Sequence, residues 1–479
     1  MTSHFVVLGL RRPQYVALPE AFISDLAWRA FPLDIATNSE KPVGLRYRTD
    51  DAGTKVLEYR QTAPTGELVG RFGEAILHNG IEGEASSELI GQAVAESVDG
   101  LAASKGSSRA VSPLTPALAL LQNTRGLMGV RNPPGIAEII EQMYAMGRED
   151  NVDGPESIRS ATGDWIAATQ RRMDIDPLLF AIDAATSSVL LRKALGDRSP
   201  APLPVRTDLG ASDDMSRPGA LTPFGWFRRA WQTLTSDEWV DALPARTWAD
   251  WATTVLRLAY GLGYLWESAW YESVARRILL EGSPITPQGV IENMDDVVPW
   301  RSSRLGVKDR DVAPLLMKRS FRADRIRQAL RERITALGLD GESFDLTMSG
   351  LQGDGETRRV LKAVLRTDER PSSGKNLWEA SRYALMTRAT DGSQPDYFGL
   401  LRSRGRFLVP DPGTEWVAVV ASLTCGSPGG MATVAEMLWT LSAMGVRPEL
   451  SDLVELLERA GLARGSADAD QAVLIQAAY

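Results

Sequence analysis

The residue types that carry most enzyme chemistry are scarce in this sequence. Its 479 residues contain two histidines, His4 and His78, and one cysteine, Cys425. A structural zinc site usually takes four ligands drawn from these two types, so one chain cannot supply them. The H-E-x-x-H motif and the zinc site of base deaminases are excluded for the same reason. A disulfide framework within the chain is also excluded, which suits a reducing cytoplasm.

Neither histidine is well placed for a catalytic triad. His4 lies in the first few residues, where chains are often loosely held. His78 lies in Ala75–Gly80, which is typical of a helix end, because a cation there interacts favourably with the helix dipole and a glycine suits the cap. Cys425 has no candidate base nearby in the sequence, so we expect a buried or incidental thiol.

One glycine-rich segment partly matches a phosphate-binding motif. Gly350 to Thr357 has the spacing of a P-loop, but Glu356 occupies the lysine position and would repel a phosphate. We interpret it as a turn before a helix over residues 358–365, with a degenerate nucleotide loop as the alternative. Residues 343–348 before it could form a strand.

Other short motifs give no catalytic site. Ser372 begins an S-x-x-K spacing, but the companion motifs S-D-N and K-T-G are absent. Two carboxylate pairs, Asp174 with Asp176 and Asp295 with Asp296, could hold Mg²⁺, but no third ligand is identifiable. We therefore predict no catalytic residue, no metal and no cofactor.

Charge is unevenly distributed along the chain. The formal net charge is −8, yet residues 301–410 hold 22 Lys and Arg against 14 Asp and Glu, a net of +8. The remainder therefore carries −16. The excess is strongest between Arg301 and Arg333, with 11 basic and 4 acidic residues. Such asymmetry indicates a surface for a charged partner.

Helical spacing groups the basic residues of this region. Lys318, Arg322 and Arg325 fall on one helix face, with Arg333 near the same side, beside an apolar stripe of Ile326, Leu330, Ile334 and Leu337. Arginine forks match phosphate oxygens. The candidate nucleic-acid-binding residues are therefore Lys318, Arg319, Arg322, Arg325 and Arg333. The leading interpretation is nevertheless a solvated face, or one that pairs with the acidic remainder of the chain, and nucleic acid or an acidic protein partner are the alternatives.

Tryptophan is concentrated in one segment. Seven of the 13 tryptophans lie between Trp226 and Trp270. Trp248 and Trp251 are spaced i, i+3, and Trp266 is spaced i, i+4 from Trp270, so each pair shares a helix face. Few basic residues interleave with them. We expect a helical core, with a partner-binding surface or a base-stacking platform as alternatives.

The remaining pattern indicates a mainly α fold with a small α/β N-terminal part. Residues 5–10 are typical of a strand, and residues 43–48 and 55–60 of a hairpin around the turn at 50–53. Residues 117–195 show helical periodicity. Neither a signal peptide nor a membrane-spanning segment is recognised, so we expect a cytoplasmic protein without membrane contact.

The C-terminal pattern consists of three helices followed by two short strands. The helices are expected at 415–423, at 433–444 and from Pro448 to Ala460, and the strands at 462–464 and 472–475. This order resembles a winged-helix domain. The resemblance covers this end of the chain alone and rests on pattern without a signature motif.

The resemblance implies that the third helix would read the major groove of DNA, as it often does in that family. Here its acidic residues outnumber Arg459, and residues 411–479 carry 9 acidic and 3 basic side chains. Phosphates repel such a surface. We therefore expect this module to contact protein, with DNA contact as the alternative.

These observations divide the chain and suggest a function. A Ser, Gly, Ala and Pro-rich segment at 102–116 and a proline-rich linker at 199–220 mark boundaries. The expected parts are a mixed α/β domain (1–115), a helical segment (116–200), a Trp-rich helical segment (220–300), a basic, mainly helical domain (301–410) and a winged-helix-like domain (411–479).

We predict a non-catalytic structural or adaptor subunit of a bacterial multi-protein complex that acts on nucleic acid, such as a defence system. Its expected partners are other protein subunits, with nucleic acid contacted through residues 301–333. One alternative is a DNA-binding transcriptional regulator. The other is an enzyme with a degenerate nucleotide-binding loop.

Overall fold

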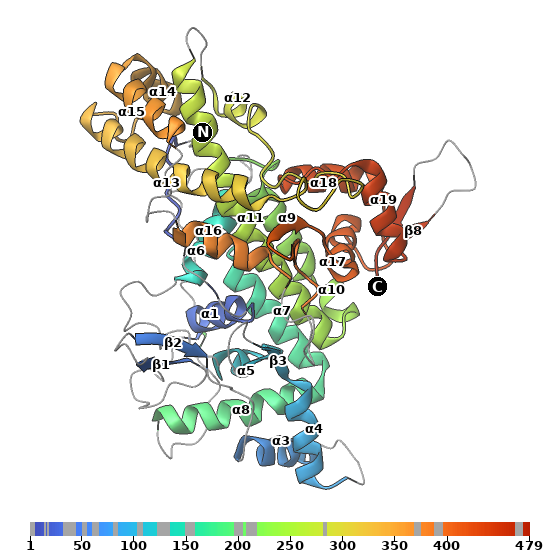
Figure 1. Ribbon diagram of the computed structural model, residues 1–479. Coiled ribbons are helices and arrows are strands. Elements are labelled where there is room, and N and C mark those ends of the chain that lie inside the picture. The colour runs from blue at the N-terminus through green and yellow to red at the C-terminus, as the bar shows by residue number, and fades with distance from the viewer. Residues whose placement is uncertain are drawn as a thin grey trace.

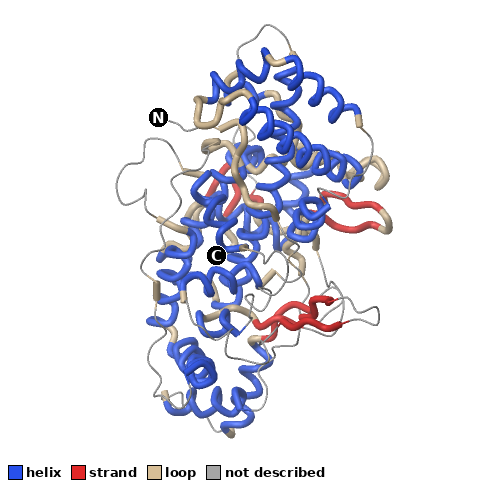
Figure 2. The backbone as a smooth tube through the Cα atoms, turned by 90° about the vertical axis from the view of Figure 1, so that its left-hand side faces the viewer, coloured by secondary structure: helices blue, strands red, loops and turns tan. Residues whose placement is uncertain are grey.

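Helices make up most of the computed structural model, and its strands are short and lie in separate places (Figure 2). The predicted mainly α fold is confirmed. The structure describes residues 5–13, 16, 19–31, 45–49, 55–59, 67–79, 85–102, 109–121, 135–148, 159–195, 205–206, 218–280, 285–367, 375–387, 396–464 and 473–479.

A 35-residue helix, α11 (Ala245–Leu279), forms the centre of the fold (Figure 1). Every residue from Trp251 to Ala275 is buried. A helix that is buried all round needs neighbours on every side. The main ones are α1 (Ala21–Ala30), α6 (Ile136–Met146), α9 (Pro223–Leu234), α13 (Ala313–Ala336) and α16 (Lys375–Leu385).

The tryptophan-rich segment forms a helical core, as predicted. Its seven tryptophans lie on α9, α10 (Asp237–Ala242) and α11, and none is more than 3% exposed. The indole Nε1 of Trp231 donates to the carbonyl of Ala161 at 3.0 Å, and Nε1 of Trp248 donates to the carbonyl of Leu234 at 2.9 Å. Both polar groups are satisfied inside the fold, which leaves these rings unavailable to a partner or a base.

The N-terminal hairpin is also confirmed. β1 (Leu45–Thr49) and β2 (Lys55–Tyr59) pair antiparallel, with Tyr47 opposite Leu57. A second antiparallel pair, β3 (Asp99–Ala102) and β4 (Arg109–Val111), was not predicted, and β4 lies inside the segment at 102–116 that the sequence indicated as a loop or boundary.

The predicted strand at residues 5–10 is wrong. No strand pairs with this segment among the described residues, and it lies instead against α11. The indole Nε1 of Trp270 donates to the carbonyl of Val6 at 3.1 Å, and the N–H of Leu8 donates to the hydroxyl of Tyr271 at 3.2 Å. The apolar residues that suggested a strand are buried against a helix.

Helices follow through most of residues 67–195, as the periodicity predicted from residue 117 on. They are α3 (Glu67–His78), α4 (Ser87–Ser97), α5 (Pro116–Leu121), α6, α7 (Ala161–Ile175) and α8 (Pro177–Leu195). The linker expected at 199–220 lies largely outside the described residues.

α12 (Pro287–Glu292) follows α11, and the basic part of the chain contains α13, α14 (Phe344–Gly353), α15 (Gly355–Arg366) and α16. The strand expected at 343–348 is wrong, because the Ser343 hydroxyl accepts the N–H of Leu346 and caps the start of α14. A hairpin of β5 (Leu401–Arg404) and β6 (Phe407–Pro410) was not predicted.

The C-terminal elements are α17 (Thr414–Cys425), β7 (Met431–Thr433), α18 (Val434–Ala443), α19 (Leu450–Arg459), β8 (Ala463–Arg464) and β9 (Leu474–Gln476). The three helices and the two final strands agree with the sequence pattern. The additional strand, β7, pairs with β9, and the sheet order is β7-β9-β8 with both pairs antiparallel.

These C-terminal elements lie against the helical core at several points. The indole Nε1 of Trp239 donates to the carbonyl of Gly426 at 2.9 Å. The Asp452 carboxylate accepts the N–H and the hydroxyl of Ser303, each at 2.8 Å. The division of the chain into five parts stays a prediction.

Candidate functional site

Helix α13 carries all five candidate nucleic-acid-binding residues. It begins after Asp311, whose Oδ1 accepts the N–H of Ala313 at 3.1 Å. Its buried side contains Ile326 and Leu330 of the predicted apolar stripe, whereas Ile334 is half-buried and Leu337 is exposed, because the last turns of the helix lie nearer the surface. The buried side also contains Arg319 and Arg327, which are 2% and 9% exposed. Arginines this deeply buried require partners inside the protein.

Arg319 and Arg322 share one such partner. Nε of Arg319 lies 3.3 Å from Oε2 of Glu272 on α11, and Nη1 of Arg322 lies 3.3 Å from Oε1 of the same carboxylate. Arg319 also donates to the carbonyl of Asp296 at 2.7 Å. The two arginines neutralise a carboxylate that is only 5% exposed. A phosphate would have to compete with that carboxylate for them.

Arg333 pairs with Asp354, at the start of α15. Its Nη2 and Nε lie 2.8 Å and 3.1 Å from Oδ2 of Asp354. The same carboxylate accepts the hydroxyl and the N–H of Thr357, at 2.6 Å and 2.8 Å. Hydrogen bonds from Thr357 and Arg333 lower the pKa of Asp354. The turn expected at 350–357 is wrong in its extent, because α14 runs to Gly353 and α15 begins at Gly355. Only Asp354 separates the two helices, and its carboxylate caps α15 through the N–H and hydroxyl of Thr357.

The other two candidates lie nearer the surface. Lys318 is exposed, and Arg325 is half-buried. Arg325 makes no hydrogen bond or ion pair within the described part of the chain. The structure thus places the five residues on one helix but divides three of them between two carboxylates of the same chain.

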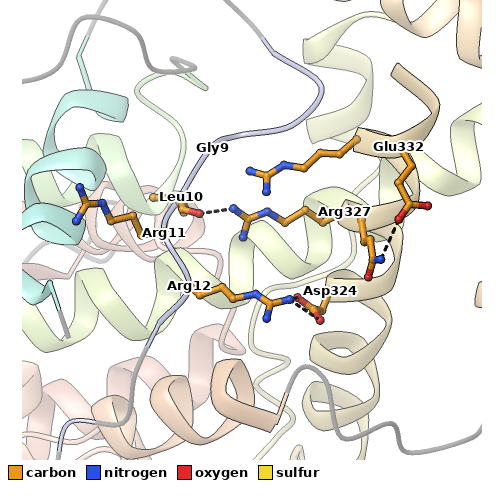
Figure 3. Close-up of a pocket in the computed structure, with 9 residues that line it drawn as sticks. Gly9, Leu10, Arg11, Arg12, Asp324, Arg327 and Glu332 are labelled. Atoms are coloured by element: carbon orange, nitrogen blue, oxygen red, sulfur yellow. Dashed lines mark hydrogen bonds and ion pairs between the residues drawn. The ribbon is translucent and has the colours of Figure 1, made fainter. Parts of the chain in front are cut away.

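A second group of arginines lies on another side of α13, where residues 9–12 run alongside it (Figure 3). Together they border a cavity of about 480 Å³. Its lining residues are Gly9, Leu10, Arg11, Arg12, Asp324, Arg327, Gln328, Arg331 and Glu332. Sequence reasoning did not bring these two walls together; the local signals were the Arg11–Arg12 pair and the i, i+4 spacing of Arg327 and Arg331, which flank one edge of the predicted helix.

Arg327 anchors the N-terminal segment over a buried carboxylate. Its Nη1 lies 3.7 Å from Oε1 of Glu267, which is 1% exposed, and its Nη2 donates to the carbonyl of Leu10. The Tyr271 hydroxyl donates to the same Glu267 oxygen at 3.2 Å. Burial raises the pKa of Glu267, while Arg327 opposes that rise.

The paired carboxylates have structural roles. Asp176 accepts the N–H of Leu178 at 2.9 Å near the start of α8, and Asp295 lies 2.9 Å from Arg276. All four carboxylates of these pairs bind groups of the chain itself: Asp174, Asp176, Asp295 and Asp296. Across the described ranges, no cluster of three or more His, Cys, Asp or Glu side chains could hold a metal ion.

The two histidines, the single cysteine and Ser372, which the sequence offered as reactive groups, form no reactive site among the described residues. His78 ends α3, as predicted, whereas His4 and Ser372 lie outside the described residues. The Cys425 thiol is half-buried, and its Sγ lies 3.6 Å from the carbonyl of Ile475. Burial raises the pKa of Cys425 to about 11, which disfavours the reactive thiolate.

No known protein family matches this sequence, and no curated protein resembles it closely enough to indicate a relative. Within the part of the chain that the structure describes, no helix has the length and apolar character needed to cross a membrane.

Proposed function

We propose that this chain is a non-catalytic subunit of a bacterial multi-protein assembly that acts on nucleic acid, and that its C-terminal elements form a winged-helix module that contacts another protein. The observation that carries the proposal is the combination of a winged-helix element order with an acidic third helix, α19.

The order of the C-terminal elements supports the winged-helix assignment. The elements run helix, strand, helix, helix, strand, strand, and the last strand lies between the other two in the sheet. The helix-turn-helix arrangement within such a module presents its final helix to a partner. Here that helix is α19, which lies at one side of the molecule, beside β8 (Figure 1).

The outer face of α19 supports a protein partner over DNA. We define this face by the exposed residues of the helix, Leu450, Ser451, Glu455, Glu458 and Arg459, so that two carboxylates outnumber one arginine. The carboxylates repel phosphates, and Leu450 is 57% exposed. The inner side is used within the chain, because Asp452 binds Ser303. The exposed face therefore suits a partner that offers an apolar contact and basic side chains.

Replacing the exposed leucine of α19 tests the proposed partner surface. We expect Leu450→Ser to weaken retention of a co-purifying protein about tenfold, because burying a leucine contributes about 1.5–3 kcal/mol. The thermal midpoint of the purified variant should match that of the unaltered chain. Retention is measured by salt-wash pull-down with a tagged chain.

A matched control is available on α14. Leu346 is also 57% exposed and also lies in the first turn of its helix, at another end of the molecule (Figure 1). Leu346→Ser should leave retention unchanged. Equal retention by both variants and the unaltered chain would remove α19 from the interface.

A DNA-binding regulator is the second candidate, and the winged-helix element order itself favours it. A regulator would bind DNA alone, with affinity falling steeply as salt rises. Charge reversal at Arg322 and Arg325 should then weaken binding and lower the salt slope by about one per phosphate contact. Arg325→Glu is the cleaner variant, because Arg322→Glu would place a carboxylate beside Glu272. If the chain is instead a subunit of an assembly, we expect the isolated chain to show no steep fall of DNA affinity with rising salt.

A further inference from the structure

The cavity between the N-terminal segment and α13 joins residues that are far apart in the sequence. Gly9, Leu10, Arg11 and Arg12 form one wall, and residues 324–332 of α13 form the other (Figure 3). Its volume of about 480 Å³ falls within the range of roughly 300–1,000 Å³ that small-molecule sites occupy. The cavity is therefore large enough for a small ligand.

The walls of this cavity are held in place by buried groups. The Tyr264 hydroxyl donates to the carbonyl of Arg11 at 2.7 Å, and Arg327 donates to the carbonyl of Leu10. Tyr264 and Arg327 come from α11 and α13, so both helices fix the path of the segment. A binding site whose walls are already in place loses less conformational entropy when a ligand binds.

Positive charge dominates the lining. Four arginines and two carboxylates, those of Asp324 and Glu332, line the cavity. The Arg12 side chain lies against Asp324, while the Arg11 side chain points away from Arg12 and Arg327 (Figure 3). Arg12 is bound to Asp324 at 3.0 Å, but its side chain remains 74% exposed. Arg331 is exposed and makes no hydrogen bond or ion pair with a described residue.

Arg327, in the cavity wall, has one buried donor that no described residue satisfies. Its side chain is 11% exposed, and its Nε has no hydrogen-bond partner in the described structure. A buried guanidinium donor without an acceptor costs free energy. Because that nitrogen is buried, an anion in the cavity would be bound by the exposed guanidinium groups of Arg12 and Arg331, and Arg327 would add positive charge beside it.

We propose that this cavity binds a phosphate-bearing ligand. Guanidinium groups bind phosphate oxygens through paired, charge-assisted hydrogen bonds. None of the nine lining residues is aromatic, so recognition depends on charge and hydrogen bonds and not on stacking of a base. The ligand is a small phosphorylated molecule or the phosphorylated end of a nucleic acid, and both present the same chemical group.

Inorganic pyrophosphate is the probe for the site, with the full-length chain. Pyrophosphate should raise the thermal midpoint in a saturable way, whereas sodium chloride at equal ionic strength should not. Arg331→Gln should weaken pyrophosphate affinity about tenfold, since one charged donor is lost. Because Arg331 is exposed, the midpoint without ligand should stay unchanged.

Arg366→Gln is the matched control, because Arg366 is an exposed arginine on α15 that does not line the cavity. It should leave affinity unchanged. Absence of saturable stabilisation at millimolar pyrophosphate, or equal weakening by Arg366→Gln, would overturn the proposal.

Competition identifies the source of the phosphate. Displacement of pyrophosphate by a terminally phosphorylated oligonucleotide, but not by its unphosphorylated form, supports a nucleic-acid end as the ligand. Saturable pyrophosphate binding that neither oligonucleotide displaces supports a small phosphorylated molecule. The inference is independent of the α19 interface, because Leu450→Ser should not change pyrophosphate affinity.

Discussion

Asp396→Asn is expected to lower the free energy of unfolding by about 3–5 kcal/mol. Both oxygens of Asp396 lie 2.8 Å from Nη1 of Arg257, in the middle of α11. The two side chains are 1% and 2% exposed. The variant keeps the shape of the side chain but leaves the arginine charge buried without a counter-ion.

The position of this ion pair explains the expected size of the effect. Arg257 also donates to the carbonyls of Ala384 and Met386, at 2.7 Å and 2.6 Å. One arginine therefore joins the central helix to the end of α16 and to the segment around Asp396. Removing the Asp396 charge should weaken the hold of Arg257 on these segments and so loosen contacts between parts of the chain that are far apart in the sequence.

Urea unfolding followed by tryptophan fluorescence measures the change. Glu356→Gln is the control, because Glu356 pairs with Arg359 at the surface, where both side chains are well exposed. Such exposed pairs contribute about 1 kcal/mol or less. Similar losses in the two variants would contradict the assignment of the Arg257–Asp396 pair as an anchor of the core.

Trp231→Ala is expected to cost about 3–5 kcal/mol of stability. Trp231 is completely buried, its ring lies against Phe227, and its Nε1 donates to the carbonyl of Ala161. The substitution removes apolar contacts, leaves a cavity and deprives a buried carbonyl of its donor. Each of these consequences lowers the stability of the folded state.

Trp439→Ala is the matched control for the core tryptophan. Trp439 is 50% exposed on α18, and Arg229 lies over its ring at 5.2 Å. Its removal should cost about 1 kcal/mol or less, in line with an exposed cation–π contact. Circular dichroism is the suitable probe, because both variants change fluorescence directly. A small loss for Trp231→Ala would contradict the tryptophan-core interpretation.

The local patterns of the sequence predicted much of the fold. The spacing of Trp248 and Trp251 placed them on one helix, and that helix is buried. The hairpin at 45–59 and the C-terminal helices followed from alternation, turns and periodicity. These signals depend on neighbours within a few residues, which the sequence displays directly.

Long-range partners could not be predicted in the same way. Residues 5–10 have an apolar pattern that suits a strand, but the side chains of α11, more than 250 residues away, hold them instead. The segment at 343–348 was mispredicted for a local reason, because the Ser343 hydroxyl caps a helix through the N–H of Leu346, three residues on. At residues 5–10 the cause is long-range. Tertiary contacts override weak local preference.

The candidate site shows the same limit. Helical spacing correctly placed Lys318, Arg322 and Arg325 on one helix. It could not predict that the Glu272 carboxylate, on another helix, binds Arg322. The N-terminal segment that forms one wall of the cavity is more than 300 residues before Arg327 in the sequence, so no local pattern could bring the two together. Periodicity describes one helix at a time, so it could not show which arginines are neutralised within the fold.

The mass of the natively purified particle tests the central claim most directly. The chain would be tagged at its own locus, purified at low salt and analysed by native mass spectrometry, with the co-eluting proteins identified. The account predicts a stoichiometric complex with a protein encoded by a neighbouring gene. A monomer without a partner, at the mass of one tagged chain, would contradict it.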